Sequence, residues 1–120
     1  MALHEIDSDL KTAEATLNHW ATKYPALAQA AWQSRVSYDL AWADAIKSIT
    51  DKAAANGEKL PTLPVQDAMA TQIVAKQMTD ARQAEADLDV AKKLIAIAET
   101  TLSSIQTRAK LSSMEMALAR

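Results

Sequence analysis

Apolar residues recur at alternating spacings of three and four through the first quarter of the chain, and this regular row is what most constrains the fold. The row consists of Leu3, Ile6, Leu10, Ala13, Leu17, Trp20, Tyr24, Leu27 and Ala31. Such alternation is the heptad pattern of a helix that packs along another helix. One glycine and three prolines in 120 residues are too few for the turns of a β-rich fold. The sequence therefore predicts an all-α protein.

The second half of the chain carries a similar row, and a single loop signal separates the two halves. The second row consists of Leu88, Ala91, Ile95, Ala98, Leu102, Ile105, Ala109, Ser112 and Met116. Between the rows, Gly57 suits the left-handed residue that closes a helix, and Pro64 suits the first turn of the next one. We expect a helix over about 3–55, a loop over about 56–64 and a helix over about 65–119. Together they predict one domain, 1–120, folded as a long antiparallel helical hairpin that resembles a coiled coil.

Three local features modify this simple hairpin. Pro25 lies inside the first row, so the first helix is expected to be kinked or broken there. The loop residues Leu60 and Leu63 are expected to cover the end of the helix pair. The heptad pattern slips after Ala31 and near the start of the second helix, and spacings of four unwind a left-handed coil locally. The slipped rows are Trp32, Val36, Leu40 and Ala43, then Trp42, Ile46, Ile49 and Ala53, and in the second half Ala70, Val74, Met78 and Ala81.

The second helix carries a further apolar row, which predicts self-association. This row consists of Val90, Leu94, Ile97, Thr101, Leu111 and Leu118. A lone hairpin covers one row of each helix, and a large exposed apolar surface usually marks an interface. We therefore expect a homo-oligomer, a dimer or small bundle, with an interface at Leu94, Ile97, Leu111 and Leu118. The alternative is that the N-terminal segment folds back at Pro25 and covers this row itself.

Catalytic and metal-binding constellations are missing from the sequence. Cysteine is absent, and the two histidines, His4 and His19, have no carboxylate at the spacing of a helical metal site. Asp80, Glu85, Asp87 and Asp89 are interpreted as a solvated acidic face that Lys92 and Lys93 neutralise. Trp20, Trp32 and Trp42 are expected to pack in a core or an interface rather than to stack on nucleic-acid bases. We expect no enzymatic activity, no catalytic residues, no cofactor and no metal.

Charge and hydropathy point to no particular partner. The net charge is −2 with mixed signs, the longest apolar run is too short to span a bilayer, and no basic segment typical of a signal peptide begins the chain. These observations predict a cytoplasmic protein with no membrane association. The C-terminal end is locally basic, with Arg108, Lys110 and Arg120. These cations offset the helix dipole, and they could instead contact phosphate or an acidic partner.

The last third of the chain resembles a group of phage-encoded proteins. Residues 84–93, which read AEADLDVAKK, lead into 106–111, which read QTRAKL, and then into Met114-Glu115-Met116. These segments are similar in composition and pattern to small helical accessory proteins of bacteriophages and prophages. Some of those proteins are encoded beside replication or recombination genes. The resemblance implies residence in a bacterial host cell. It also implies an alternative function, an oligomeric accessory factor of DNA recombination or replication that contacts single-stranded DNA or its binding proteins. The residues themselves predict first a non-enzymatic coiled-coil interaction and assembly protein.

Overall fold

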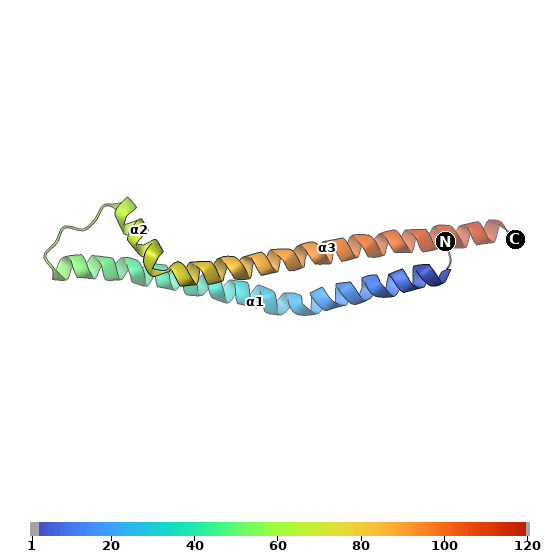
Figure 1. Ribbon diagram of the computed structural model, residues 1–120, viewed down its shortest axis with the longest axis horizontal. Helices are drawn as coiled ribbons and strands as arrows, with labels where there is room; N and C mark the ends of the chain where they lie inside the picture. The colour runs from blue at the N-terminus through green and yellow to red at the C-terminus, as the bar shows by residue number, and fades with distance from the viewer. Residues whose placement is uncertain (1–2, 120) are drawn as a thin grey trace. The chain divides into compact units, whose positions relative to one another are not determined.

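The computed structural model describes the backbone of residues 3–119 and the side chains of residues 4–119. Its helices are α1 (Leu3–Ala55), α2 (Leu63–Ile73) and α3 (Ala75–Leu118), and no strand occurs in this part of the chain (Figure 1). The described chain is 92% helical. The predicted all-α helical hairpin is therefore confirmed, and α1 has the predicted bounds.

The contacts group into two compact units that share α1 and α3. Unit 1 comprises the described residues of Met1–Ala26 and Leu88–Arg120, and unit 2 comprises Leu27–Asp87. In each unit a stretch of α1 lies beside a later helix that runs in the opposite direction. Each unit has a small core of its own.

The core of unit 1 forms where the two heptad rows meet. Ile6, Ala13 and Ile105 are buried there. Leu10, Leu102 and Ala109 pack against them, and all six belong to the predicted rows. Ala91 and Ala98 are also buried. The predicted row is wrong at its last position, because Met116 is 47% exposed.

The core of unit 2 follows a different packing rule. Ala45 and Ile49 of α1 are buried against Ala70 of α2 and Val74, with Tyr38, Ala41, Trp42 and Ile46 around them. Buried residues on both sides are spaced by four, as in Ala45, Ile49 and Ala53 facing Gln66, Ala70 and Val74. Rows spaced by four are inclined to the helix axis, and two such rows interlock when helices cross obliquely, at about −50°. The predicted slip of the heptad pattern is therefore present on both sides of the loop, at residues 45–53 and at residues 66–74, although not directly after Ala31.

The second helix predicted for 65–119 is instead two helices, because the regular geometry is interrupted at Val74. The backbone of Val74 has φ −98° and ψ 15°, yet its N–H still donates to the Ala70 carbonyl at 3.0 Å. Buried residues are four apart before this point. After it, buried and half-buried residues are three or four apart, as in Val74, Met78, Ala81, Ala84, Leu88 and Ala91. A change of direction at Val74 lets α2 cross α1 while α3 runs along it (Figure 1).

The outer row of α1 in unit 2 is not part of the core. The buried side of α1 continues through Ala31, Ser34, Tyr38 and Ala45, so the slip begins only near Ala45. Trp32 and Leu40 are 67% and 63% exposed on the opposite side of the helix. Trp32 is expected from the sequence to pack in a core or an interface; it does not pack in the core, and its place in an interface stays a prediction.

Pro25 lies inside continuous α1, so the alternative of a broken helix is wrong. Proline removes only its own N–H and strains the turn before it. The heptad residues on either side, Trp20, Tyr24 and Leu27, remain partly buried. Packing along the row is thus kept across the proline.

The loop between α1 and α2 is shorter than predicted, because α2 already begins at Leu63. Gly57 has the predicted left-handed conformation, with φ 65°. Gly57 N–H donates to the Ala54 carbonyl at 3.2 Å, and Glu58 N–H donates to the Ala53 carbonyl at 2.9 Å. These two bonds form a Schellman motif that ends α1.

The loop side chains do not cover the end of the helix pair as expected. Leu60 and Leu63 are both exposed, because the chain leaves the Schellman turn away from the core. Buried Gln66 instead ties α2 to the loop, since its Nε2 donates to the Pro61 carbonyl at 2.7 Å. Pro64 lies in the first turn of α2, as predicted.

Alanine dominates the buried surface. Eight of the twelve buried apolar residues of the described chain are alanine, and the other four are Ile6, Ile49, Val74 and Ile105. Alanine lets helices approach closely but removes little apolar area from water. Thirteen large apolar side chains are exposed, against these four buried ones. This imbalance directs attention to the outer surfaces of the helices.

Candidate helix-binding groove

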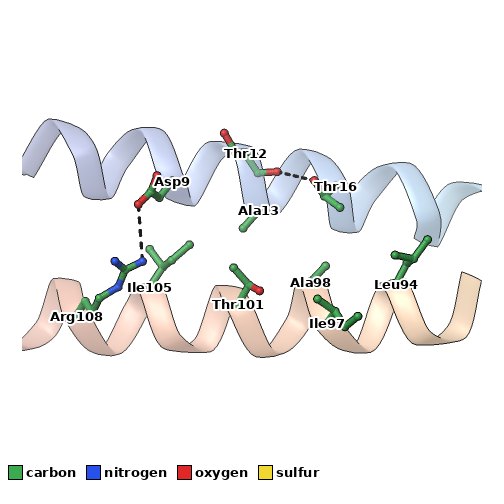
Figure 2. A pocket seen from close by; sticks show the side chains of 10 residues that line it. All are labelled: Asp9, Thr12, Ala13, Thr16, Leu94, Ile97, Ala98, Thr101, Ile105 and Arg108. Carbon is green, nitrogen blue, oxygen red and sulfur yellow. Dashed lines mark hydrogen bonds and ion pairs between the residues drawn. The ribbon is translucent and has the colours of Figure 1, made fainter.

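A groove of about 320 Å³ lies between α1 and α3 in unit 1 (Figure 2). Its lining residues are Asp9, Thr12, Ala13 and Thr16 of α1 and Leu94, Ile97, Ala98, Thr101, Ile105 and Arg108 of α3. Most of this lining is apolar. The groove therefore suits aliphatic side chains more than a polar ligand.

Small residues on the core row create the hollow. Ala13 and Ala98 both form part of the lining, and each has only a methyl group to fill the space between the helices. Larger residues at the rims, Leu94 and Ile97, rise beside them on α3. A groove with a floor of alanine and walls of larger side chains is the shape that receives residues of a further helix.

Threonines form the wall on the α1 side. Thr12 Oγ1 donates to the Ser8 carbonyl, and Thr16 Oγ1 donates to the Thr12 carbonyl, each at 3.0 Å. Their hydroxyl hydrogens are therefore satisfied within α1. The two threonines consequently offer no free hydroxyl hydrogen to a ligand, so this wall of the groove is less polar than two threonines would otherwise make it.

An ion pair closes one end of the groove. Arg108 Nη2 lies 3.7 Å from Asp9 Oδ2, and both side chains are partly exposed (Figure 2). The pair joins α3 to α1 across the helix interface. An exposed pair of this kind contributes little to stability, about 0–1 kcal/mol. Its greater effect is to place opposite charges beside an apolar surface.

The four predicted interface residues separate into two groups. Leu94 and Ile97 line the groove. Leu111 and Leu118 lie further along α3, outside the groove, and both are exposed. Val90, Ile97, Leu111 and Leu118 differ by multiples of seven, so they follow one side of α3. The structure thus leaves the predicted second row uncovered within unit 1, and its role as an interface stays a prediction.

The three cations predicted to contact phosphate are not gathered into one patch. Arg108 is paired with Asp9. Lys110 is exposed, and its position two residues after Arg108 places it on a different side of α3. Arg120 lies outside the described residues. Their contact with phosphate or an acidic partner stays a prediction.

The sequence analysis missed the α1 side of the groove. Asp9, Thr12 and Thr16 are spaced by three and four and lie beside the core row of Leu10, Ala13 and Leu17. In a heptad they take the positions that flank the core. Threonine and aspartate have no strong apolar signal, so only the neighbouring row of α3 reveals their place in a groove.

Two of the acidic residues of α3, Glu85 and Asp87, form polar contacts. Glu85 Oε1 lies 3.8 Å from Arg35 Nη1, and Asp87 Oδ1 accepts a hydrogen bond of 2.9 Å from Gln83 Nε2. Among residues 4–119, no three histidine or carboxylate side chains lie close enough together to hold a metal ion. No described helix is both long and apolar enough to cross a membrane.

Comparison with known protein families, curated proteins and solved structures gives no match to this chain. The groove and the exposed rows are therefore the features from which a function can be argued.

Proposed function

We propose that this protein is a non-enzymatic, self-associating helical interaction protein, in which unit 1 receives α3 of a second chain. The groove between α1 and α3 carries this proposal, because it is apolar and continues into the uncovered row of α3. Helix-in-groove recognition uses apolar residues at spacings of three, four and seven. Val90 and Ile97 are seven residues apart on α3, and so are Leu111 and Leu118. The exposed row of α3 would thus have two roles in each chain. It would enter the groove of the second chain, and it would also form one edge of the chain's own groove.

The amount of exposed surface supports association. The chain of 13.0 kDa has 8666 Å² of accessible surface. A compact monomer of this mass exposes about 6,300 Å². Obligate homodimers bury 2,000 Å² or more in total. The surface that this chain exposes beyond that of a compact monomer of its mass is large enough for such an interface.

Replacement of Ile97 and Leu111 together by lysine tests the proposal. Both residues are exposed within unit 1, so the variant keeps its helicity by circular dichroism. We expect the mass measured by light scattering at tens of micromolar to fall, because two lysines desolvated in an apolar seam are costly. The matched control is Gln106→Lys with Ser113→Lys, two exposed positions on another side of α3, which keeps the wild-type mass. A wild-type protein that is monomeric at this concentration would overturn the proposal.

The same variants separate this function from a DNA accessory role. A protein that acts through phosphate contacts binds single-stranded DNA with an affinity that falls steeply with salt. We expect no salt-dependent binding from the wild-type protein, since Arg108 is engaged by Asp9 and the net charge is −2. Strong binding at low salt that Lys110→Ala weakens would favour the DNA role instead.

A further inference from the structure

The outer side of α1 in unit 2 carries an apolar stripe opposite the core. The stripe consists of Trp32, Val36 and Leu40, with Gln29 before it and Ala43 after it. Trp32 and Leu40 are among the most exposed large apolar residues of the described chain, and Val36 lies between them, partly covered. The core residues Ala31, Tyr38 and Ala45 lie on the other side of the same helix. In unit 2, α1 thus has apolar residues on two opposite sides, the core side and the stripe.

The spacing of this stripe is symmetric about Val36. Its five positions are separated by three, four, four and three residues, so it reads the same in both directions. We infer that this stripe pairs with the same stripe of a second copy, antiparallel, with the two-fold axis at Val36. An isologous contact of this kind requires a self-complementary surface.

The symmetry gives every residue of the stripe a counterpart. Positions whose numbers sum to 72 lie at the same level, so Val36 meets Val36 of the second copy, Trp32 meets Leu40, and Gln29 meets Ala43. From 100° per residue, Trp32 and Leu40 lie on opposite sides of the centre line of the stripe. They therefore pass beside each other, large side chain next to smaller one, as knobs do in an antiparallel coiled coil.

Charges along one edge of the stripe complement each other in this arrangement. Arg35 and Asp39 lie on the same edge and form an ion pair within one chain, with Arg35 Nε 3.5 Å from Asp39 Oδ1. About the axis at Val36, Arg35 of one copy comes within two residues of the level of Asp39 of the other, about 3 Å along the helix. Two reciprocal Arg–Asp pairs then flank the seam.

This contact is separate from the groove of unit 1, and the two predict different assemblies. The stripe belongs to α1 in unit 2, while the groove residues belong to unit 1. A chain with one isologous contact forms a closed dimer, and a chain with two different ones forms larger assemblies. Variants at the two surfaces therefore report on them independently.

Cysteine substitution tests the axis directly, because the chain has no native cysteine. We expect Val36→Cys to form an intermolecular disulfide under mild oxidation. The two Val36 Cα atoms would face each other across the two-fold axis at about 5–6 Å, and a disulfide joins Cα atoms that are about 4.4–6.8 Å apart. Leu40→Cys is the matched control. It lies in the same stripe and is more exposed than Val36, but its symmetry mate is eight residues away along the axis, about 12 Å. Trp32→Cys mixed with Leu40→Cys should cross-link as a heterodimer.

Equilibrium mass gives the second readout. We expect Val36→Asp to lower the wild-type mass about twofold, because two carboxylates would face each other on the axis. Ser37→Asp, exposed on another side of α1, should leave the mass unchanged, and both variants should keep full helicity. When Val36→Asp is combined with Ile97→Lys and Leu111→Lys in one chain, we expect the measured mass to be that of a monomer.

The outcomes distinguish this inference from the proposed function. If the Ile97 and Leu111 variant loses mass while Val36→Asp does not, the groove proposal stands and the stripe has a different occupant. If only Val36→Asp loses mass, the stripe pairing stands and the groove proposal falls. Equal cross-linking of Val36→Cys and Leu40→Cys would overturn the placement of the axis.

Discussion

Alanine controls how closely the helices of this protein approach. Ala91 is fully buried in α3, while Ala96, five residues later, is exposed on another side of the same helix. The two residues have the same chemistry and helix propensity but opposite environments. They therefore offer a clean measurement of packing at a single position.

Ala91→Leu should destabilise the protein by about 1–3 kcal/mol, because extra methylene groups in a close helix contact force the helices apart. Ala96→Leu should change the free energy of unfolding by less than about 0.5 kcal/mol, as expected for a surface position. Urea denaturation followed by circular dichroism measures both. Equal stability of the two variants would show that the helices are not in close contact at Ala91.

The places where the helices end or are interrupted are determined by a few residues. The Schellman motif at Gly57 ends α1 although Ala53, Ala54 and Ala55 before it favour helix strongly. Gly57 has open space around its Cα, so a methyl group there meets no other atom. Its role is therefore a matter of backbone conformation alone.

Gly57→Ala should cost about 1–2 kcal/mol, because an L-residue with a Cβ is strained at φ 65°. Asn56→Ala serves as the control, since the positive φ occurs at Gly57 and not at Asn56. The midpoint of urea denaturation should fall for Gly57→Ala with an unchanged slope. A midpoint equal to that of the wild type would mean that the loop readily adopts another turn.

The interruption at Val74 has a different origin from the end at Gly57. No glycine or proline lies near it, and the residues from Thr71 to Ala75 can all continue a helix. The cause is the change in the spacing of buried and half-buried residues, from four in α2 to three or four in α3. Local sequence is therefore compatible with one helix, and packing against α1 divides it into two.

At the scale of the whole molecule, the apolar surface is distributed unusually. Each unit buries mainly alanine, and larger apolar residues lie exposed in ordered rows on α1 and α3. Small cores supply little stability to a chain of this size. We expect association to provide part of what the monomer lacks.

The melting temperature should therefore rise with protein concentration, because a partner that binds only the folded chain stabilises it by mass action. Differential scanning calorimetry over about a hundredfold range of concentration measures the shift. The double variant Ile97→Lys and Leu111→Lys should show a smaller shift than the wild type. A melting temperature independent of concentration would indicate that each chain is stable by itself.

The helical class, the bounds of α1, the turn at Gly57 and most of the core rows could be predicted from the sequence. These follow from heptad spacing, from helix propensity and from the conformation that glycine alone adopts easily, all of which are local properties. The rows at Ile6, Ala13, Ala98 and Ile105 were readable because a buried row must repeat along a helix.

Which of the several apolar rows is buried could not be predicted from the sequence, because it depends on how the helices pack. Trp32 and Leu40 are as apolar as the core residues, yet they lie exposed because α1 meets its neighbour through Tyr38 and Ala45 on the other side. The groove depends likewise on two helices, since Thr12 and Thr16 face Leu94 and Ile97 only when α1 and α3 are paired. Spacing along a chain fixes which residues share one side of a helix. Which side another helix covers depends on the packing of both, and that is not a local property.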